Sequence, residues 1–322
     1  MNLNELQARA KRHEPLSKHT TARIGGPADL LIEVRTTDEL VAVAQRAEEM
    51  GLPYLVLGGG ANVLVSDAGV RGLVIVNRAR EIKFNVRGSK ARVEVDSGVM
   101  LTTLARDCIE RGLAGMEWAV NVPGTVGGAV VGNAGAYGAD IAGNLNLVRV
   151  MPRGRAPEYW TPRQLQFGYR TSALKRYAPA DRPIVLSATF DLRLDYRANL
   201  ERRANEFIAR RKATQPSGAS IGSMFKNPDG DYAGRLIEAC GLKGKCIGGA
   251  MISDKHANFF INVSGDARAS DVKALIDLAH DAVLRRFGIN LELEIELIGE
   301  WADAELRIGK LNPGDQGGAD ER

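Results

Sequence analysis

The sequence predicts an α/β fold that is divided into more than one domain. Three observations lead to this prediction. The chain has 322 residues, which is too long for one ordinary hydrophobic core. Its first 80 residues combine a helical pattern with short apolar strands, as α/β segments do. A charged helix near residue 198 then introduces a C-terminal segment with a long amphipathic helix of its own.

The first 80 residues contain one expected helix and two expected strands. The helix begins at a capping-box pattern, Thr36-Thr37-Asp38-Glu39, and apolar residues 40, 41, 44 and 47 fall on one of its faces. Gly51 and Pro53 end it. The apolar runs 54–57 and 73–76 are expected to be strands. This alternation of helix and strand is the basis of the α/β prediction.

The middle of the chain is expected to be mostly antiparallel sheet. Residues 82–99 alternate apolar and polar side chains, which predicts paired strands, and a helix follows over 101–111 with Gly112 as its end. Further strands are expected near 147–150 and 184–192.

The C-terminal part is expected to begin with the charged helix 198–212. A short helix over 233–239 follows, with Gly241 as its end, and Ser270 is expected to cap a long helix with an apolar face. Residues 291–298 alternate Leu or Ile with Glu, which predicts a last strand. The tail after residue 305 is rich in Gly, Pro and charge and is expected to be disordered.

Two glycine-rich segments are the strongest indication of a ligand. Gly58-Gly59-Gly60-Ala61-Asn62 follows a strand directly, so bare backbone N–H groups could approach a pyrophosphate there. The spacing matches neither a Walker A loop nor a Rossmann fingerprint. The segment PGTVGGAVVGNAGAYG (123–138) holds six glycines, and we expect no regular element at that density. Two such loops in one region indicate an extended ligand, for which a dinucleotide has a suitable length.

Composition excludes several classes of protein. No apolar run approaches the roughly 20 residues that a membrane-spanning helix needs, and the N-terminus lacks the apolar core of a secretory signal, so a cytoplasmic protein is expected. Cys108, Cys240 and Cys246 form no C-x-x-C pair and are expected to be buried free thiols. The net charge of +4 is spread along the chain, which gives little support to nucleic-acid binding. His256 and the cysteines lack metal-ligand spacing, so no metal is expected.

Several polar residues are candidates that the pattern alone leaves open. Arg170 lies between aromatic and hydroxyl residues in FGYRTS (167–172), where it could be a surface residue or a partly buried anion-binding residue. Ser223 lies in a glycine-flanked loop without the surroundings of a serine hydrolase. Glu292, Glu294 and Glu296 would share one strand face. Such a face is usually solvated, but a buried member would have a raised pKa and could act as an acid or as an electrostatic partner.

Seven segments in order resemble the UDP-N-acetylenolpyruvoylglucosamine reductase family in its shorter, type II-like form, from about residue 19 to residue 299. They are HTTARIGGPAD (19–29), LGGGANVLVSD (57–67), VPGTVGGAVVGNAGAYG (122–138), FGYRTS (167–172), GSMFKNP (222–228), AGRLIEACGLKGKCIGGAMISDKHANFFIN (233–262) and LELEIELIG (291–299). Their order and their gaps make a chance match implausible.

The resemblance implies a specific domain organisation. The implied fold has an FAD-binding region of two α/β subdomains, of the PCMH or vanillyl-alcohol-oxidase type. A smaller C-terminal α/β domain follows it and binds the substrate. We place the two subdomains at 1–80 and 81–197, the substrate domain at 198–305 and the tail at 306–322. Non-covalent FAD, NADPH as the hydride donor and a UDP-sugar as the second substrate are implied as small-molecule partners, and a monomer is expected.

The family's chemistry is the reduction of an enolpyruvyl group to give UDP-N-acetylmuramate, with a hydride from flavin N5. Carried over by position, Ser223 matches the serine that donates a proton, and Arg170 and Glu294 match the pair that stabilises the enolate. Asn227, Lys243 and His256 match substrate contacts. The flavin contacts carried over are Gly58, Gly59, Gly60, Ala61, Asn62, Val122, Pro123, Gly124, Thr125, Gly127, Gly128, Asn133 and Gly135.

The chain departs from other members at two places. Glu296 stands where they often carry a basic residue, and the extra tyrosine-bearing loop of longer members is missing, so closure over the substrate must differ. Two rival functions remain: an oxidase on the same FAD-binding scaffold, and a UDP-sugar binding protein without enzymatic activity. The motif GSMFKNP and the glutamate-rich C-terminal segment argue against the oxidase.

Overall fold

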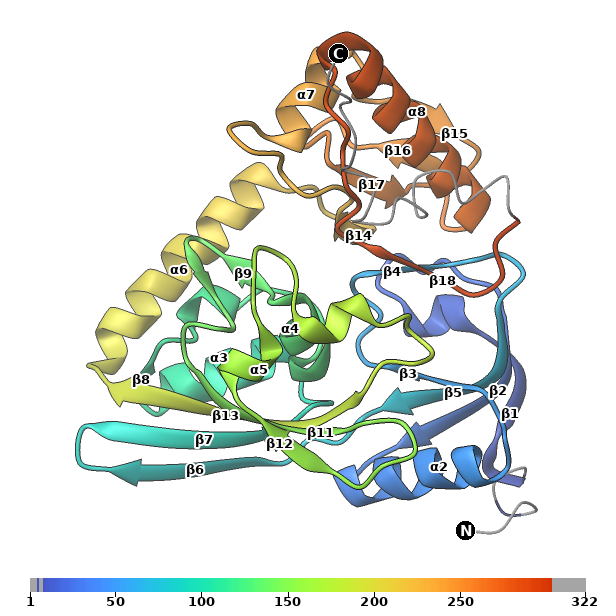
Figure 1. Ribbon diagram of the computed structural model, residues 1–322. Coiled ribbons are helices and arrows are strands. Elements are labelled where there is room, and N and C mark those ends of the chain that lie inside the picture. Colours follow the sequence, from blue (N-terminus) through green and yellow to red (C-terminus); the bar gives the residue numbers. More distant parts are fainter. Residues whose placement is uncertain (1–4, 6–7, 303–322) are drawn as a thin grey trace, which may run out of the picture.

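The computed structural model describes residue 5 and residues 8–302. The expected disordered tail, 306–322, lies outside the described residues. Figure 1 shows three parts: a parallel sheet with one helix (blue), an antiparallel sheet with helices (cyan to yellow-green), and a C-terminal part in orange and red above both. Helix α6 (Arg197–Thr214) connects the second part to the third along one side of the molecule.

The first part is a sheet of four strands in the order β1-β2-β5-β3. β2, β5 and β3 are parallel, and β1 pairs with β2 in the antiparallel sense. Leu40, Val43 and Ala44 of helix α2 are fully buried against this sheet. The elements are β1 (Lys11–Pro15), η1 (Leu16–His19), β2 (Pro27–Val34), α2 (Thr37–Glu49), β3 (Tyr54–Leu57), β4 (Val63–Val65) and β5 (Val70–Asn77).

The second part is an antiparallel sheet in the order β12-β11-β13-β7-β6, with β8 paired to β13. Its helices pack on one face of the sheet and share one large core with it. The elements are β6 (Ile82–Arg87), β7 (Lys90–Asp96), α3 (Leu101–Glu110), β8 (Leu113–Ala114), η2 (Glu117–Ala119), α4 (Val126–Gly132), β9 (Gly135–Ala136), β10 (Ala139–Asp140), β11 (Leu145–Met151), β12 (Glu158–Trp160), α5 (Pro162–Leu165), η3 (Ala173–Arg176) and β13 (Ile184–Leu194).

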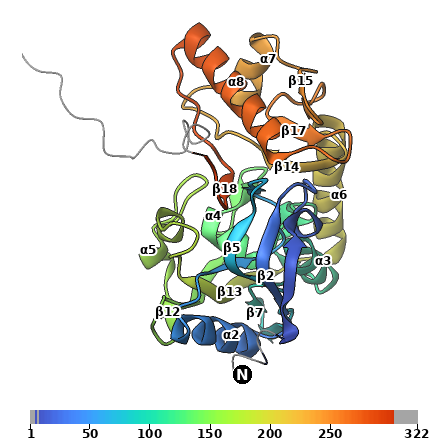
Figure 2. The same cartoon turned by 90° about the vertical axis from the view of Figure 1, so that its right-hand side faces the viewer.

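The third part is an antiparallel sheet in the order β14-β17-β16-β15, covered by two helices. Figure 2 shows both helices on the outer side of this sheet. The predicted apolar face of the long helix is confirmed, because Val272, Leu275, Ile276, Ala279 and Val283 are buried in the core. The elements are β14 (Ala219–Ser223), α7 (Ala233–Ala239), β15 (Cys246–Ile247), β16 (Ala250–Ile252), β17 (Phe259–Asn262) and α8 (Ala269–Phe287).

The last strand does not belong to the third sheet. β18 covers only Glu296–Ile298 and pairs in parallel with β4 of the first part. The expected continuous strand 291–298 is therefore wrong in its first half. Leu293 makes an isolated bridge to Phe225, and the chain then bends toward the first part before β18 begins. This crossing places the glutamates of the segment at the junction of the three parts.

The glycine-rich segment contains a helix that we did not expect. α4 occupies residues 126–132, and Val126, Ala129 and Val130 of this helix are buried in the second core. A Cβ on Gly127 would lie 2.9 Å from the Cβ of Ser97. Packing therefore outweighs the entropic penalty of glycine, since only a bare backbone allows the helix to approach Ser97 so closely.

Two other local expectations were wrong in part. Ser270 is not the cap of α8; its hydroxyl donates to Asp67, whose carboxylate also accepts the backbone N–H groups of Ala269 and Ser270. The cap therefore comes from another domain, which sequence spacing cannot reveal. Of the three free cysteines only Cys108 is buried, and Cys246 is exposed.

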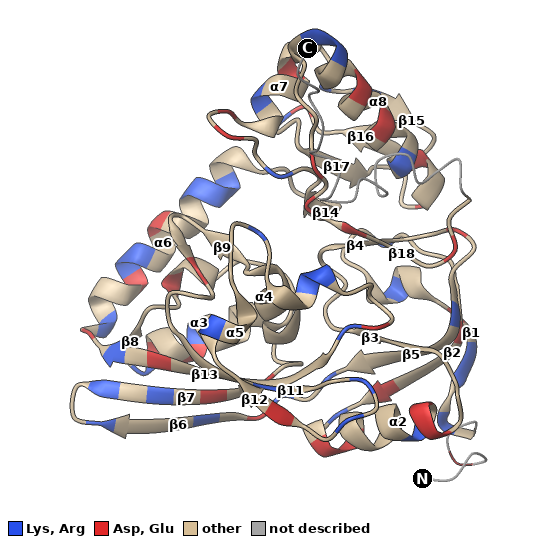
Figure 3. Cartoon of the chain, viewed as in Figure 1, with Lys and Arg blue, Asp and Glu red and all other residues tan. Residues whose placement is uncertain are grey.

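The expected domain boundaries stay a prediction. The boundary at 80 falls between β5 and β6, and the boundary at 197 falls at the first residue of α6. Basic and acidic residues alternate over all three parts of the chain, as Figure 3 shows. No helix in the described part of the chain is long and apolar enough to cross a membrane.

Candidate active site

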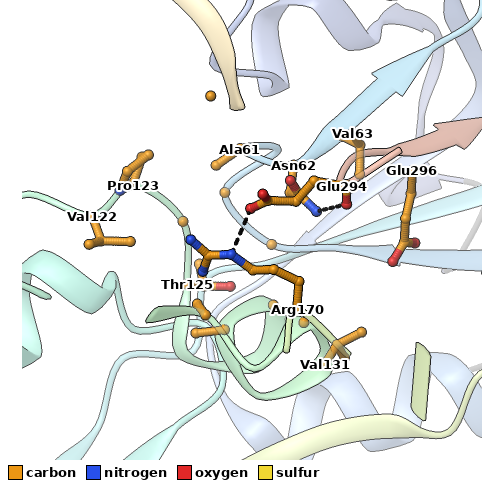
Figure 4. A pocket seen from close by; sticks show the side chains of 18 of the residues that line it. Ala61, Asn62, Val63, Val122, Pro123, Thr125, Val131, Arg170, Glu294 and Glu296 are labelled. Carbon is orange, nitrogen blue, oxygen red and sulfur yellow. Dashed lines mark hydrogen bonds and ion pairs between the residues drawn. The ribbon is translucent and has the colours of Figure 1, made fainter. Parts of the chain in front are cut away.

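A cavity of about 920 Å³ lies where the three parts meet. Its wall includes both glycine-rich segments, the segment around Arg170, strand β14 and the C-terminal glutamates. Pockets of this size hold extended organic ligands. Figure 4 shows part of the cavity, with the side chains of Arg170 and Glu294 pointing toward each other between residues of the two glycine-rich segments.

The two glycine-rich loops are packed directly against each other. A Cβ on Gly58 would lie 2.3 Å from Thr125 Oγ1, and a Cβ on Gly59 would lie 3.0 Å from the Cα of Gly124. Gly60 has a φ of +59° and leaves no room for a side chain beside His19. These positions therefore need glycine for the loops to approach and turn as they do.

Twelve of the thirteen expected cofactor contacts line this cavity; the exception is Asn133. Asn133 is buried in a left-handed conformation and its amide donates to Asp140 and to the carbonyl of Gly168, two residues before Arg170. The side chain thus holds the loop that carries Arg170, and its expected contact with a cofactor stays a prediction.

Much of the wall that these residues form is backbone without Cβ atoms. A Cβ on Gly128 would meet nothing closer than Thr125 Oγ1 at 3.9 Å, so this residue borders open space. Exposed peptide groups along an elongated cavity suit a flat, extended ligand with a pyrophosphate. The residues present therefore fit FAD.

The three expected catalytic residues converge at one end of the cavity. Arg170 Nε lies 3.1 Å from Glu294 Oε1, and Asn62 donates its side-chain N–H to the backbone carbonyl of Glu294 at 3.1 Å. Arg170 has a φ of +55°, an uncommon conformation for a residue with a side chain. Such backbone strain is found at sites where a side chain must point in a fixed direction.

Ser223 ends strand β14 beside the glutamate segment. The backbone N–H of Glu294 donates to the carbonyl of Met224 at 2.8 Å, so the two segments run next to each other. Within residues 8–302 the Ser223 hydroxyl has no hydrogen-bond partner, and it borders the cavity. Its proton is therefore free to be directed toward a ligand.

Lys175 is a residue that the sequence did not single out. It is largely buried and its ammonium donates to the carbonyl of Glu294 at 2.8 Å, with the carbonyl of Arg170 at 3.5 Å. Burial lowers the pKa of Lys175. Lys175 thus connects the segments that carry Arg170 and Glu294, and its place five residues after Arg170 is the one signal of this contact in the sequence.

Glu294 and Glu296 are both largely buried, with 16% of each side chain exposed, and they differ in their ionic partners. Desolvation raises the pKa of Glu294, against the opposing effect of the cations Arg170, Lys175 and Lys226. Glu292 is 71% exposed and pairs with Lys226 at 2.8 Å. Glu296 lines the cavity and pairs with Arg182 at 3.0 Å, so it does not face water. The structure thus separates the three residues that the pattern left equivalent.

The raised pKa of Glu294 predicts a pH dependence of stability. The folded protein keeps a proton on Glu294 at pH values where the unfolded chain, with a carboxyl pKa near 4.5, has lost it. Relative to Glu294→Gln, the free energy of unfolding of the wild type should therefore fall as the pH rises from the unfolded value through the folded one. The slope is at most about 1.4 kcal/mol per pH unit.

This difference is measured by denaturant unfolding of the wild type and of Glu294→Gln at a series of pH values. The series runs from about pH 4 to about pH 9, the range in which the carboxyl group titrates and the folded and unfolded states stay soluble. Glu292→Gln, which removes the exposed carboxylate of the same segment and keeps Glu294, is the matched control and should lose stability relative to Glu294→Gln as the wild type does. A wild type that gains stability over Glu294→Gln as the pH rises would contradict the assignment.

Only two of the three expected substrate contacts line the cavity. Asn227 and His256 line the cavity, whereas Lys243 does not and pairs with Glu238 at 2.8 Å. His256 Nδ1 accepts the backbone N–H of Asn258, and burial lowers the pKa of His256. A neutral ring with its proton on Nε2 is the form this arrangement favours. The contact of Lys243 with substrate stays a prediction.

No group of three or more His, Cys, Asp or Glu residues that could hold a metal ion occurs among residues 8–302.

Two family models match the chain. The model described as FAD binding domain matches residues 28–151, and the model described as UDP-N-acetylenolpyruvoylglucosamine reductase, C-terminal domain, matches residues 213–298. The matches confirm the predicted α/β fold with an FAD-binding region and a separate C-terminal part.

Curated proteins and solved structures agree with these models. UDP-N-acetylenolpyruvoylglucosamine reductase 2 of Symbiobacterium thermophilum is 44% identical over 90% of this chain and 92% of its own length. The reductase of Chloroflexus aurantiacus is 43% identical over 88% of this chain and 96% of its own. The crystal structure of the reductase (MurB) from Thermus caldophilus has a TM-score of 0.75 and 37% identity, covering 90% of this chain and 98% of that one.

Proposed function

The chain belongs to the UDP-N-acetylenolpyruvoylglucosamine reductase family, and from this membership we propose that it reduces the enolpyruvyl group of UDP-N-acetylglucosamine enolpyruvate with NADPH, giving UDP-N-acetylmuramate. Membership makes the chain an oxidoreductase of peptidoglycan precursor synthesis with FAD as cofactor. NADPH as donor, the proton donor and the site residues are parts of the proposal.

One observation carries the proposal: the paired Arg170 and Glu294 line the same glycine-rich cavity as Ser223, whose hydroxyl has no hydrogen-bond partner among the described residues. Reduction of an enolpyruvyl group needs these three groups. Hydride addition to one carbon places negative charge on the neighbouring carbon and on its carboxylate, so the site must hold an anion and deliver one proton.

The residues of this chain have separate tasks in the proposed reaction. FAD, when bound, supplies the hydride. Arg170 binds the substrate carboxylate, because its planar guanidinium matches a carboxylate with two N–H donors. Glu294 orients Arg170 through their ion pair, and Lys175 adds positive charge to the same end of the cavity. The developing enolate is thereby stabilised by positive charge that is already in place.

Ser223 is the proposed proton donor. The carbon next to the hydride acceptor must receive its proton on one face, and a positioned hydroxyl has one approach to it. An enolate of this type is more basic than a carboxylate, and a hydroxyl held near cations can donate to it. The free hydroxyl of Ser223 beside the Glu294 segment supports this assignment.

The glycine-rich loops are proposed to hold FAD through backbone groups, with Gly58 to Asn62 on one side and Val122 to Gly128 on the other. Gly128→Val tests the placement. The new side chain would enter the open space beside Thr125, and valine has a higher helix propensity than glycine, so α4 should remain formed. Flavin affinity should fall about 5- to 150-fold, because overpacking costs about 1–3 kcal/mol.

The measurement is the flavin content of the purified, folded variant. Gly143→Val is the control, since Gly143 is exposed and does not line the cavity. Gly127→Val is less informative, because its side chain would collide with Ser97 and disturb the protein itself. A folded Gly128→Val protein with full flavin occupancy would remove FAD from this position.

The substrate is proposed to lie between the FAD region and the C-terminal part, with Asn227 and His256 as contacts and Lys243 near the diphosphate. NADPH and the sugar are proposed to use the same end of the cavity in turn. The domain boundaries, a monomeric state and a cytoplasmic location accompany the proposal as predictions.

Steady-state turnover tests the proposed function. We expect NADPH oxidation that depends on the enolpyruvyl sugar and gives UDP-N-acetylmuramate, with little oxygen consumed. NADPH oxidation that consumes oxygen equally with and without the sugar would favour an oxidase on the same scaffold. A purified wild type without flavin would contradict the proposal.

A further inference from the structure

Arg153 lines the same cavity but has no part in the chemistry proposed above. It follows β11 and its guanidinium carbon lies 3.6 Å from the centre of the Tyr54 ring, at the start of β3. A second contact is the N–H that it donates to the carbonyl of Tyr54 at 3.3 Å. Arg153 is thus held at a fixed place on the wall by the first residue of β3.

The charge of Arg153 is not balanced by a carboxylate. Among residues 8–302 no Asp or Glu lies within ion-pair distance of its guanidinium, and its Nε is buried without a hydrogen-bond partner. Glu48 and Asp181 act on its charge only from beyond that distance, and Glu48 is engaged by the hydroxyl of Tyr54 and the backbone N–H of Gly154. Burial lowers the pKa of Arg153 to about 10. A half-buried cation without a carboxylate partner among the described residues is unfavourable unless a ligand compensates its charge.

Arg153 lies at the end of the cavity that is remote from the catalytic residues. Asn62 contacts Glu294, so this residue marks the catalytic end. From Asn62 the loop runs back through Gly58 to β3, and β3 extends a further ~10 Å, at about 3.3 Å per residue, before it reaches Tyr54. The opposite wall of the cavity also leads to Arg153. Ile184 lines the cavity and pairs with Met151, which lies two residues before Arg153.

From this position we infer that Arg153 binds the adenosine monophosphate half of FAD and makes the protein selective for FAD over FMN. The inference rests on the proposed function, which places the redox-active ring of the cofactor beside Ser223 and Glu294. An extended dinucleotide with its ring at that end has its adenosine half at the other. The guanidinium, which stacks on Tyr54 and lines the cavity, offers its other face and its positive charge to a purine or a phosphate.

The test compares the two flavins, because FMN lacks the adenosine monophosphate half. Purified full-length holoprotein is diluted and FAD release is followed by flavin fluorescence. Separate samples are incubated with excess FMN, desalted, and the bound flavin is identified by chromatography. For Arg153→Met we expect an FAD dissociation constant about 10- to 100-fold above wild type, as for the loss of a hydrogen bond to a charged group. The FMN dissociation constant should be unchanged.

Two further variants complete the experiment. Arg155→Met is the matched control, because Arg155 is exposed, pairs with Glu158 and does not line the cavity; it should behave as the wild type. Arg153→Gln keeps polar donors and replaces Arg153→Met if the latter does not fold. FAD affinity within about threefold of wild type in the folded variant, a difference under ~1 kcal/mol, would overturn the inference. Equal losses of FAD and FMN affinity would overturn it too, since they indicate a structural role. Flavin-free wild type would instead contradict the proposed function.

Discussion

Replacing Ser223 by alanine is expected to slow the sugar-reducing half-reaction by about 10²–10⁴, the usual contribution of a positioned general acid. The reason is local. Its hydroxyl borders the cavity beside the glutamate segment and has no partner among residues 8–302, so the substitution removes one oxygen atom and no protein contact. Flavin content, stability and reduction by NADPH should therefore stay close to wild type.

Stopped-flow measurement of the two half-reactions separates this role from a structural one. Ser220→Ala is the matched control: Ser220 lies on the same strand, three residues earlier, and does not line the cavity. Ser223→Cys should recover part of the rate, because a thiol also donates a proton. A sugar-reducing rate for Ser223→Ala within a factor of about three of wild type, a barrier change under ~1 kcal/mol, would remove Ser223 as the donor.

The second large effect is expected at Arg170. Arg170→Lys keeps the charge but loses the planar pair of donors that suits a carboxylate. Sugar reduction should fall by about 10²–10³, the loss observed when one donor to a developing anion is removed. Reduction by NADPH should fall much less, because the nicotinamide group has no carboxylate for Arg170 to bind.

The control for Arg170 lies in the same segment. Arg176→Lys changes a residue of η3 that hydrogen-bonds to Gln166 and does not line the cavity, so both half-reactions should be unaffected. If Arg170→Lys slowed both half-reactions equally, Arg170 would be a structural residue of the loop that Asn133 holds, and the proposed carboxylate contact would be wrong.

The sequence predicted those features that depend on local pattern. Strands β3, β5 and β13 and helices α2, α6 and α7 lie where periodicity and glycine stops placed them. The two glycine-rich loops could be predicted as one ligand site, because glycines directly after a strand leave a bare backbone that a ligand can approach. In contrast, helix α4 was missed, because its stability comes from packing against Ser97 and not from helix propensity.

The parts of the site that the sequence could not predict depend on contacts between remote segments. The alternation at 292–296 gave three equivalent glutamates, and only the crossing of the chain from Phe225 to β4 makes them different. Glu296 is balanced by Arg182, 114 residues away, and the position of Glu294 is held by Lys175 and Asn62. No spacing rule connects such pairs, because the fold alone brings them together.

The Glu296–Arg182 pair bears on the departure from other members of the family. A basic residue at position 296 would add a further cation beside Arg182 and Lys175, whereas Glu296 pairs with Arg182 and gives the local cluster a compensating charge. The carboxylate at this position is therefore explained as a charge partner within the cavity wall.

In the proposed reaction, reducing equivalents from NADPH reach the enolpyruvyl sugar through a flavin held in this cavity. Anaerobic stopped-flow spectroscopy of the wild type follows each of the two transfers. The flavin absorbance should disappear on addition of NADPH, persist in the reduced form without oxygen, and return in one turnover when UDP-N-acetylglucosamine enolpyruvate is added. Absorbance that stays low after the sugar is added, and returns only when oxygen is admitted, would contradict the proposed reaction.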